Sequence, residues 1–188
     1  MRDDSDEVVW ASVLSGDIRQ YGTIWDRHRD RVHRHLIASG NTSSNSEDLT
    51  AATFLELWRR RGAVRFVDGS LLPWLIVTAQ NVSRNAARAR RRYDRFLAAL
   101  PAPSVVPDHA DQVAERTDER TVALRAAMSA ARPTDAKLLA MTALEGFTIR
   151  EAAAALGLTE SAAKMRLVRV RTRLRSAVSP HLIPEGGS

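Results

Sequence analysis

The side chains in this sequence best suited to chemistry are cations that recur at helical spacing near its carboxyl end. Arg166, Arg169 and Arg173 stand three or four residues apart, so at about 100° per residue they share one side of a helix. The opposite side carries an apolar stripe, formed by Ala163, Leu167, Val170 and Leu174. A helix that packs by one face and presents long cations on the other can hold phosphates and base edges. The chemistry indicated is therefore the binding of nucleic acid rather than catalysis.

A short helix and a tight turn would position this cationic helix. Apolar residues recur at helical spacing over 149–156, Gly157 supplies the permissive backbone that ends that helix, and Thr159 can cap the next. The small Ser161 lets the second helix approach a major groove closely, with Lys164 as its first long cation. The pattern predicts a helix-turn-helix over residues 148–175. The alternative is an ordinary helical hairpin whose arginines form a solvated face.

Composition favours the same class. The chain has 188 residues, 28 Lys and Arg against 22 Asp and Glu, and a formal net charge of +6, which suits a polyanionic partner. No apolar segment is long enough to span a membrane and no secretory leader precedes the acids at positions 3–7, which predicts a cytoplasmic protein without a membrane partner. Cysteine is absent, which excludes disulfides and a Cys-based zinc site.

The chain divides into two helical blocks. Residues 18–96 look helical almost throughout, residues 101–118 contain three prolines and scattered acids, and helical periodicity returns at about Thr121. No strand-like alternation of useful length and no internal repeat is found. We therefore expect an all-α fold of two small helical domains joined by a flexible linker.

Three helices are expected in the first block. The first runs from Ile18 to Ser39, the second from a capping hydroxyl at Ser46 to Arg61, and the third from Leu71 or Pro73 to about residue 96. The third is the most basic segment of the chain, with Arg84, Arg88, Arg90, Arg91, Arg92 and Arg95. Its asparagines Asn81 and Asn85 lie between these cations and can hydrogen-bond base edges.

Histidines and tryptophans in this block have competing interpretations. His28, His33 and His35 lack carboxylates at metal-ligand spacing, so a solvated helical face is favoured over a metal site. For Trp74, burial after a helix-initiating proline is favoured over stacking on an unpaired base. Trp58 can be core or an exposed anchor for a protein partner.

Three segments, in this order, resemble a known family. SEDLTAATFLELWRR resembles the core-binding segment of sigma factors, PWLIVTAQNVSRNAARARRR their minus-10 recognition and melting helix, and EGFTIREAAAALGLTESAAKMRLVRVRTRLR their minus-35 helix-turn-helix. The chain is thereby identified as a member of the sigma-70 superfamily, in its short extracytoplasmic-function group. The resemblance implies sigma region 2 over residues 1–98, a linker over 99–120, region 4 over 121–180 and a tail over 181–188.

The resemblance also implies roles for particular residues. Core RNA polymerase, through the β′ clamp helices, would be gripped by Asp48, Leu49, Phe54 and Trp58. The minus-10 element would be captured by Arg65, Asp68, Asn81, Arg84 and Arg88. The minus-35 element would be read by Ser161, Lys164, Arg166 and Arg169. The β flap of the polymerase, promoter DNA and an anti-sigma factor are the other partners implied.

The function predicted is a sigma factor that binds core RNA polymerase and directs promoter-specific transcription initiation, with no catalytic residue, metal or cofactor. A stand-alone helix-turn-helix regulator would explain the second block but leaves the segments upstream unexplained. A nucleic-acid enzyme would need clustered acids, whereas Glu47 and Asp48 are helix neighbours whose side chains diverge.

Overall fold

The structure is a computed structural model that describes residues 4–99 and 131–178. These residues form seven helices, and their only β pairing is an isolated bridge between Val67 and Ser70, so the predicted all-α class is confirmed. The helices are α1 (Asp6–Leu14), α2 (Arg19–Ala38), α3 (Ser43–Arg59), α4 (Leu72–Ala99), α6 (Pro133–Ala143), α7 (Ile149–Leu156) and α8 (Glu160–Val178). Of the linker predicted over 99–120, the structure describes only Ala99, which is the last residue of α4. The helical start near Thr121 and the predicted tail lie outside the described residues.

Two details of the first bundle differ from the sequence prediction. Helix α3 begins one turn earlier than expected, because the Thr42 hydroxyl accepts from the Asn45 N–H at 3.3 Å and caps it. The predicted cap at Ser46 is wrong, since that residue is fully buried inside the helix. Helix α1 was not predicted. Its apolar residues surround the axis, with Trp10 buried and Val8 exposed, so they form no stripe of helical period.

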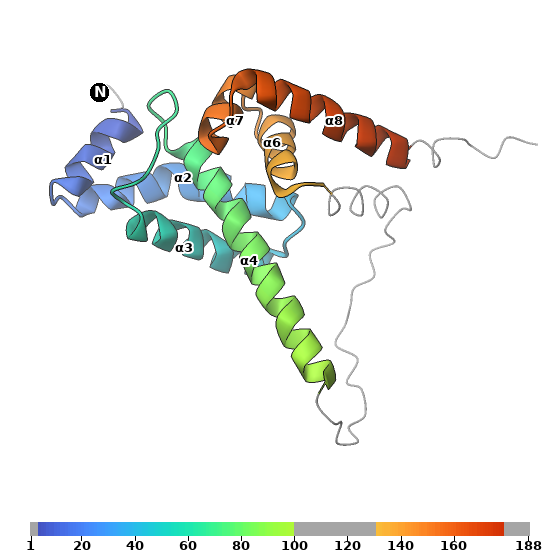
Figure 1. Cartoon of the computed structure of the whole chain (residues 1–188). Coiled ribbons are helices and arrows are strands. Elements are labelled where there is room, and N and C mark those ends of the chain that lie inside the picture. Colours follow the sequence, from blue (N-terminus) through green and yellow to red (C-terminus); the bar gives the residue numbers. More distant parts are fainter. Residues whose placement is uncertain (1–3, 100–130, 179–188) are drawn as a thin grey trace, which may run out of the picture.

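Helices α1 to α4 pack as one bundle around side chains from each of them. The fully buried members include Trp10 of α1, Ile24 of α2, Leu57 of α3 and Leu75 of α4. Helix α4 continues well past this bundle (Figure 1), and its side chains over 85–98 are all exposed. The most basic part of the chain is thus a helical arm.

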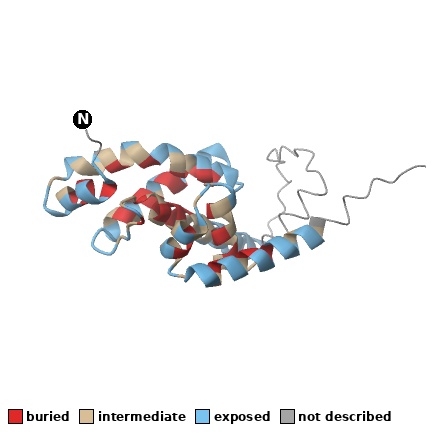
Figure 2. Ribbon diagram, turned by 90° about the horizontal axis from the view of Figure 1, so that it is seen from above, coloured by how far each residue is buried: buried red, intermediate tan, exposed pale blue. Residues whose placement is uncertain are grey.

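The predicted helix-turn-helix is confirmed in its local chemistry. A capping box between Thr148 and Glu151 starts α7, and Gly157 ends it in the left-handed region at φ 66°. The Thr159 hydroxyl accepts from the Ala162 N–H at 3.2 Å and caps α8. The apolar stripe of α8 packs inward through its buried members Ala163, Leu167 and Val170, and the opposite face of the helix is exposed (Figure 2).

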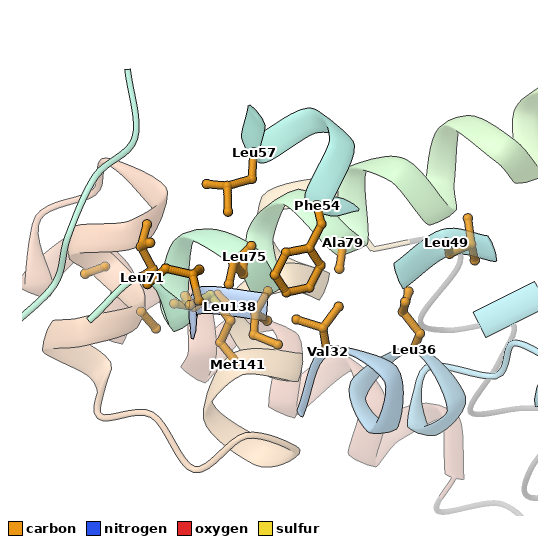
Figure 3. Packing of buried hydrophobic residues seen from close by; sticks show 14 of the residues in the cluster. Val32, Leu36, Leu49, Phe54, Leu57, Leu71, Leu75, Ala79, Leu138 and Met141 are labelled. Carbon is orange, nitrogen blue, oxygen red and sulfur yellow. The ribbon is translucent and has the colours of Figure 1, made fainter. Parts of the chain in front are cut away.

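Helices α6, α7 and α8 form a second, C-terminal bundle, which packs against the N-terminal bundle of α1 to α4. Helices α6 and α7 lie against the first half of α4 (Figure 1), and one apolar cluster runs through both bundles. Figure 3 shows Leu138 and Met141 of α6 among side chains from α2 and α4, including Val32 and Leu75. No helix in the described ranges is long and apolar enough to cross a membrane.

Candidate nucleic-acid and partner interfaces

The outer face of α8 carries the residues expected at the minus-35 element. Ser161, Lys164 and Arg169 are exposed there, beside two exposed apolar side chains, Met165 and Val168. Lys164 pairs with Glu160 one turn earlier at 2.7 Å, an exposed contact that costs little to break. The face therefore offers long cations together with apolar contact area.

Arg166 is placed differently from its neighbours. It is half-buried, and its guanidinium lies 2.9 Å from Asp135 Oδ1 of α6. Arg166 nevertheless borders a hollow of about 370 Å³ with Arg132, Arg169 and Arg173. The Asp135 carboxylate lines the same hollow, so four guanidinium groups face one carboxylate and leave a net positive charge that suits a phosphate. Sequence reasoning missed Arg132 here, because it precedes α6 and only the tertiary fold brings it to α8.

The loop expected at the minus-10 element has a defined shape. Val67 and Ser70 exchange two backbone hydrogen bonds of 3.0 Å across a turn whose central residues are Asp68 at φ 51° and Gly69 at φ 75°. Both angles lie in the left-handed region, which Gly and Asp tolerate best. The turn holds Arg65 and Asp68 exposed at the edge of the N-terminal bundle.

Helix α4 supplies the other residues expected at the minus-10 element. Asn81 and Arg88 are exposed, and Arg84 is half-buried in a cleft of about 600 Å³ between the bundles. Lys137 of α6 enters the same area and donates a hydrogen bond to the Asn81 side-chain oxygen. Burial, together with the charge of Arg84, lowers the pKa of Lys137. The α4 surface is thus strongly cationic, and α6 covers part of it.

Ion pairs of two acidic residues, Glu145 and Asp68, join the bundles. The Glu145 carboxylate, which follows α6, accepts from Arg31 Nε at 2.9 Å and from His35 Nδ1 at 2.8 Å. Arg150 of α7 pairs with Asp68 at 2.7 Å. Burial alone would raise the pKa of Glu145, but the hydrogen bonds from His35 and Arg31 outweigh it and lower that pKa. Of the five residues expected at the minus-10 element, Asp68 and Asn81 therefore bond directly to the C-terminal bundle.

The expectation of a solvated histidine face is wrong for His28 and His35. Both rings are buried, and each bonds to a carboxylate far away in sequence: His28 to Asp6 at 2.6 Å and His35 to Glu145. Asp6 also accepts from Arg27, and burial raises its pKa while the hydrogen bonds from His28 and the Leu71 N–H lower it, to about 2 overall. Within residues 4–99 and 131–178 no three His, Asp or Glu side chains gather in a way that could hold a metal.

The residues expected to grip polymerase divide between surface and core. Asp48 is exposed and Trp58 half-buried, whereas Leu49 and Phe54 are buried in the bundle. The large exposed apolar side chain of α3 is Leu55, with 60% of its area accessible. It borders an open hollow of about 380 Å³ whose other walls are Ile18, Tyr21, Trp25, Ala51, Phe54 and Trp58. Exposed apolar area bounded by aromatic rings is typical of a protein-binding surface.

Comparison with known proteins assigns both bundles. Residues 24–93 match the family model of sigma-70 region 2, and residues 121–174 match that of sigma-70 region 4. RNA polymerase sigma factor CarQ of Myxococcus xanthus is 31% identical over 81% of this chain and 85% of its own. The extracytoplasmic-function sigma factor SigM of Mycobacterium tuberculosis is 26% identical over 90% of this chain and 83% of its own. The chain belongs to the extracytoplasmic-function group of the sigma-70 family.

Solved structures support the fold. CnrH, in complex with the cytosolic domain of CnrY, superimposes with a TM-score of 0.61 and 22% identity over 94% of this chain and 99% of CnrH. The sigma factor RpoE of Bartonella quintana, in complex with the anti-sigma factor NepR, gives a TM-score of 0.54 and 19% identity over 86% of this chain and 98% of RpoE. Both matched structures are complexes with a second chain.

Proposed function

We propose that this sigma factor joins core RNA polymerase through the hollow between α2 and α3 and reads a promoter through two surfaces, one on each bundle. The observation that carries the proposal is the separation of these three surfaces in chemistry and position. One is apolar and aromatic around Leu55, and two are cationic, on α8 and on α4 with its adjoining loop. A stand-alone regulator would not need the apolar surface, because it does not bind core polymerase.

The polymerase contact centres on Leu55 and Trp58, with Asp48 at its edge. Since Leu49 and Phe54 are buried, they support this surface from beneath. Arg61 lies over the Trp58 ring, 4.9 Å from its centroid, and Tyr21 meets the same ring edge-on at 5.6 Å. Aromatic side chains already fixed by their neighbours lose little entropy on binding, which suits them as anchors for the β′ clamp helices.

The two cationic surfaces bind different elements of the promoter. Ser161, Lys164 and Arg169 enter the major groove at minus-35, where Arg166 and the cationic hollow hold the backbone. Arg65, Asp68 and Asn81 receive the minus-10 strand, with Arg84 and Arg88 on its phosphates. Unstacking a base costs a few kcal/mol, which these phosphate and pocket contacts offset.

The two bundles have to separate before both cationic surfaces can bind one promoter. Promoter positions minus-35 and minus-10 are 25 base pairs apart, which at about 3.4 Å per pair is roughly 85 Å of duplex. In the structure, Asp68 of the minus-10 loop and Arg150 of the helix-turn-helix are only 2.7 Å apart. The two reading surfaces reach one promoter only after α6 and α7 leave α4.

Run-off transcription with core polymerase, this chain and genomic fragments tests the proposal. Transcripts with discrete starts that depend on the chain are expected, and they should be lost with Leu55→Asp because that holoenzyme fails to assemble. The control is Arg59→Ala, which changes an exposed residue on the same helix that pairs with Glu56 at the surface, and it should retain activity. Promoter-specific DNA binding without stable polymerase binding would instead favour the stand-alone regulator. In either case the chain acts in the cytoplasm, as a binding protein rather than an enzyme.

A further inference from the structure

Helix α1 contacts both ends of the loop that carries Arg65 and Asp68. At the start of the loop, the Trp10 indole N–H donates to the Arg61 carbonyl oxygen at 3.0 Å. At its end, Asp6 Oδ2 accepts from the Leu71 N–H at 2.8 Å. The loop is therefore fixed at each end by the same nine-residue helix.

Asp6 is the centre of this arrangement. Beside Leu71, its carboxylate accepts from His28 Nε2 at 2.6 Å, from Arg27 at 3.2 Å and from the Ser70 hydroxyl at 3.3 Å. The residue is 7% exposed, so these bonds form out of water, where a carboxylate is costly unless it is fully bonded. Two of its four donors belong to the last residues of the loop, and the other two to the rigid face of α2.

The middle of the loop rests on the same helix start. A Cβ added to Gly69 would lie 3.5 Å from Ser5 Cβ, and Ser5 is the residue that caps α1 through its hydroxyl. The turn of Asp68 and Gly69 is therefore seated directly above the cap. A loop tied at both ends and supported beneath its turn has little freedom to change the direction of its outward side chains.

We propose that Asp6 is a positioning residue for minus-10 recognition, because it sets the conformation in which the loop presents Arg65 and Asp68 to the DNA strand. The inference rests on the proposed role of that loop. Asp6 does not touch DNA in this proposal. Helix α1 lies outside residues 24–93, the part that the family model of region 2 matches, so recognition here depends on a segment that this model does not describe.

The proposal predicts a change in base preference, which a merely stabilising carboxylate would not alter. Holoenzyme made with Asp6→Asn is presented with single-stranded oligonucleotides randomised at six positions, and the bound strands are sequenced. We expect a flatter base preference than the wild type gives, and about tenfold weaker binding of the strand that the wild type selects, because a loop released from Asp6 has to be ordered again on binding. Amide hydrogen exchange over residues 64–71 should become faster.

The matched control is Glu7→Gln, which makes the same carboxylate-to-amide change one residue further along α1, where the side chain is exposed. It should select the wild-type strand. Unchanged base preference and affinity in Asp6→Asn would overturn the inference, whatever happens to its stability. If Asp6→Asn does not fold, His28→Leu decides, because it removes one of the four donors and should flatten the preference in the same direction.

Direct variants of the minus-10 surface separate failure of this inference from failure of the proposed function. If Arg65→Ala and Asn81→Ala lose the selected strand while Asp6→Asn keeps it, only the inference falls. If Arg65→Ala and Asn81→Ala also bind it as the wild type does, the minus-10 surface is misplaced and both proposals fall.

Discussion

Removing the Glu145 side chain should loosen the packing of the two bundles and uncover the minus-10 surface. Glu145→Ala deletes two of the hydrogen bonds that cross the seam, those from Arg31 Nε and His35 Nδ1. It leaves the third bond of Glu145, which its backbone carbonyl oxygen accepts from Arg31 at 2.6 Å, and it leaves the bonds of Lys137 and Arg150 to the N-terminal bundle. It also leaves the apolar contacts of Leu138 and Met141.

The size of the effect follows from the burial of the pair. The Glu145 side chain is 6% exposed and that of Arg31 is 42% exposed, so the bond to His35 is shielded from water and the bond to Arg31 is partly screened. The shielded bond contributes about 1.5 kcal/mol and the screened bond less, so the variant should weaken the association of the two bundles by about 2 kcal/mol. That is about a 30-fold shift of the equilibrium toward the parted form.

The sequence is convenient for measuring this shift because it contains no cysteine. Spin labels on Ser44→Cys of α3 and Ser176→Cys of α8, both exposed positions in different bundles, report the distance between the bundles. We expect one short distance in the wild type and a second, broad and longer distribution in Glu145→Ala. Glu7→Ala, a variant of an exposed glutamate on α1, is the control and should match the wild type.

DNA binding gives an independent measurement of opening. A single strand selected by the holoenzyme should bind free Glu145→Ala protein more tightly than the free wild type. In the separated form, Lys137 no longer bonds to Asn81 and Arg150 no longer pairs with Asp68, so both residues are accessible to the strand. Affinity for duplex DNA should stay within about twofold, since the outer face of α8 is already exposed. An unchanged distance distribution, or equal gains for single strand and duplex, would refute this explanation of how the bundles are held.

Other variants test the remaining surfaces. Leu55→Asp should weaken core polymerase binding by about 30-fold with an unchanged melting temperature, whereas Leu49→Ala should cost about 2 to 4 kcal/mol in urea unfolding because that side chain is buried. Arg169→Ala should reduce the salt dependence of duplex binding by about one unit of slope, while Arg166→Ala should also lower the melting temperature because it leaves a buried carboxylate unpaired. Asp6→Asn should be about 2 kcal/mol less stable than the wild type at pH 7, from a pKa lowered to about 2. Since that stabilisation is complete above the ordinary pKa of 3.8 and is lost as the pH falls through the lowered pKa, the difference should persist in unfolding experiments to about pH 5 and shrink below it.

Local signals in the sequence were sufficient for the helix-turn-helix. Gly157 and Thr159 act through their own backbone and nearest neighbours, so their roles as helix end and helix cap could be predicted from residue type. The rotation of α3 about its own axis could not be predicted from residue type. Leu49 and Phe54 on one side and Leu55 on the other are all apolar, and only packing against α2 and α4 decides which side is buried.

Polar contacts between residues far apart in the sequence could not be predicted either. His28 and His35 bond to carboxylates 22 and 110 residues away, and no spacing rule connects such positions. The same holds for α1, whose contacts with the loop depend on tertiary placement. Sequence reasoning therefore identified the cationic surfaces themselves but could not identify the residues that hold and cover them.

The apolar cluster shared by both bundles determines how much apolar surface the free protein would expose if the bundles separated. Leu138 and Met141 owe part of their burial to the N-terminal bundle, so parting the bundles turns core into exposed apolar surface. A chain that opened without a partner would tend to aggregate and would be open to proteases. The packed form therefore keeps this apolar surface covered until a partner surface replaces it.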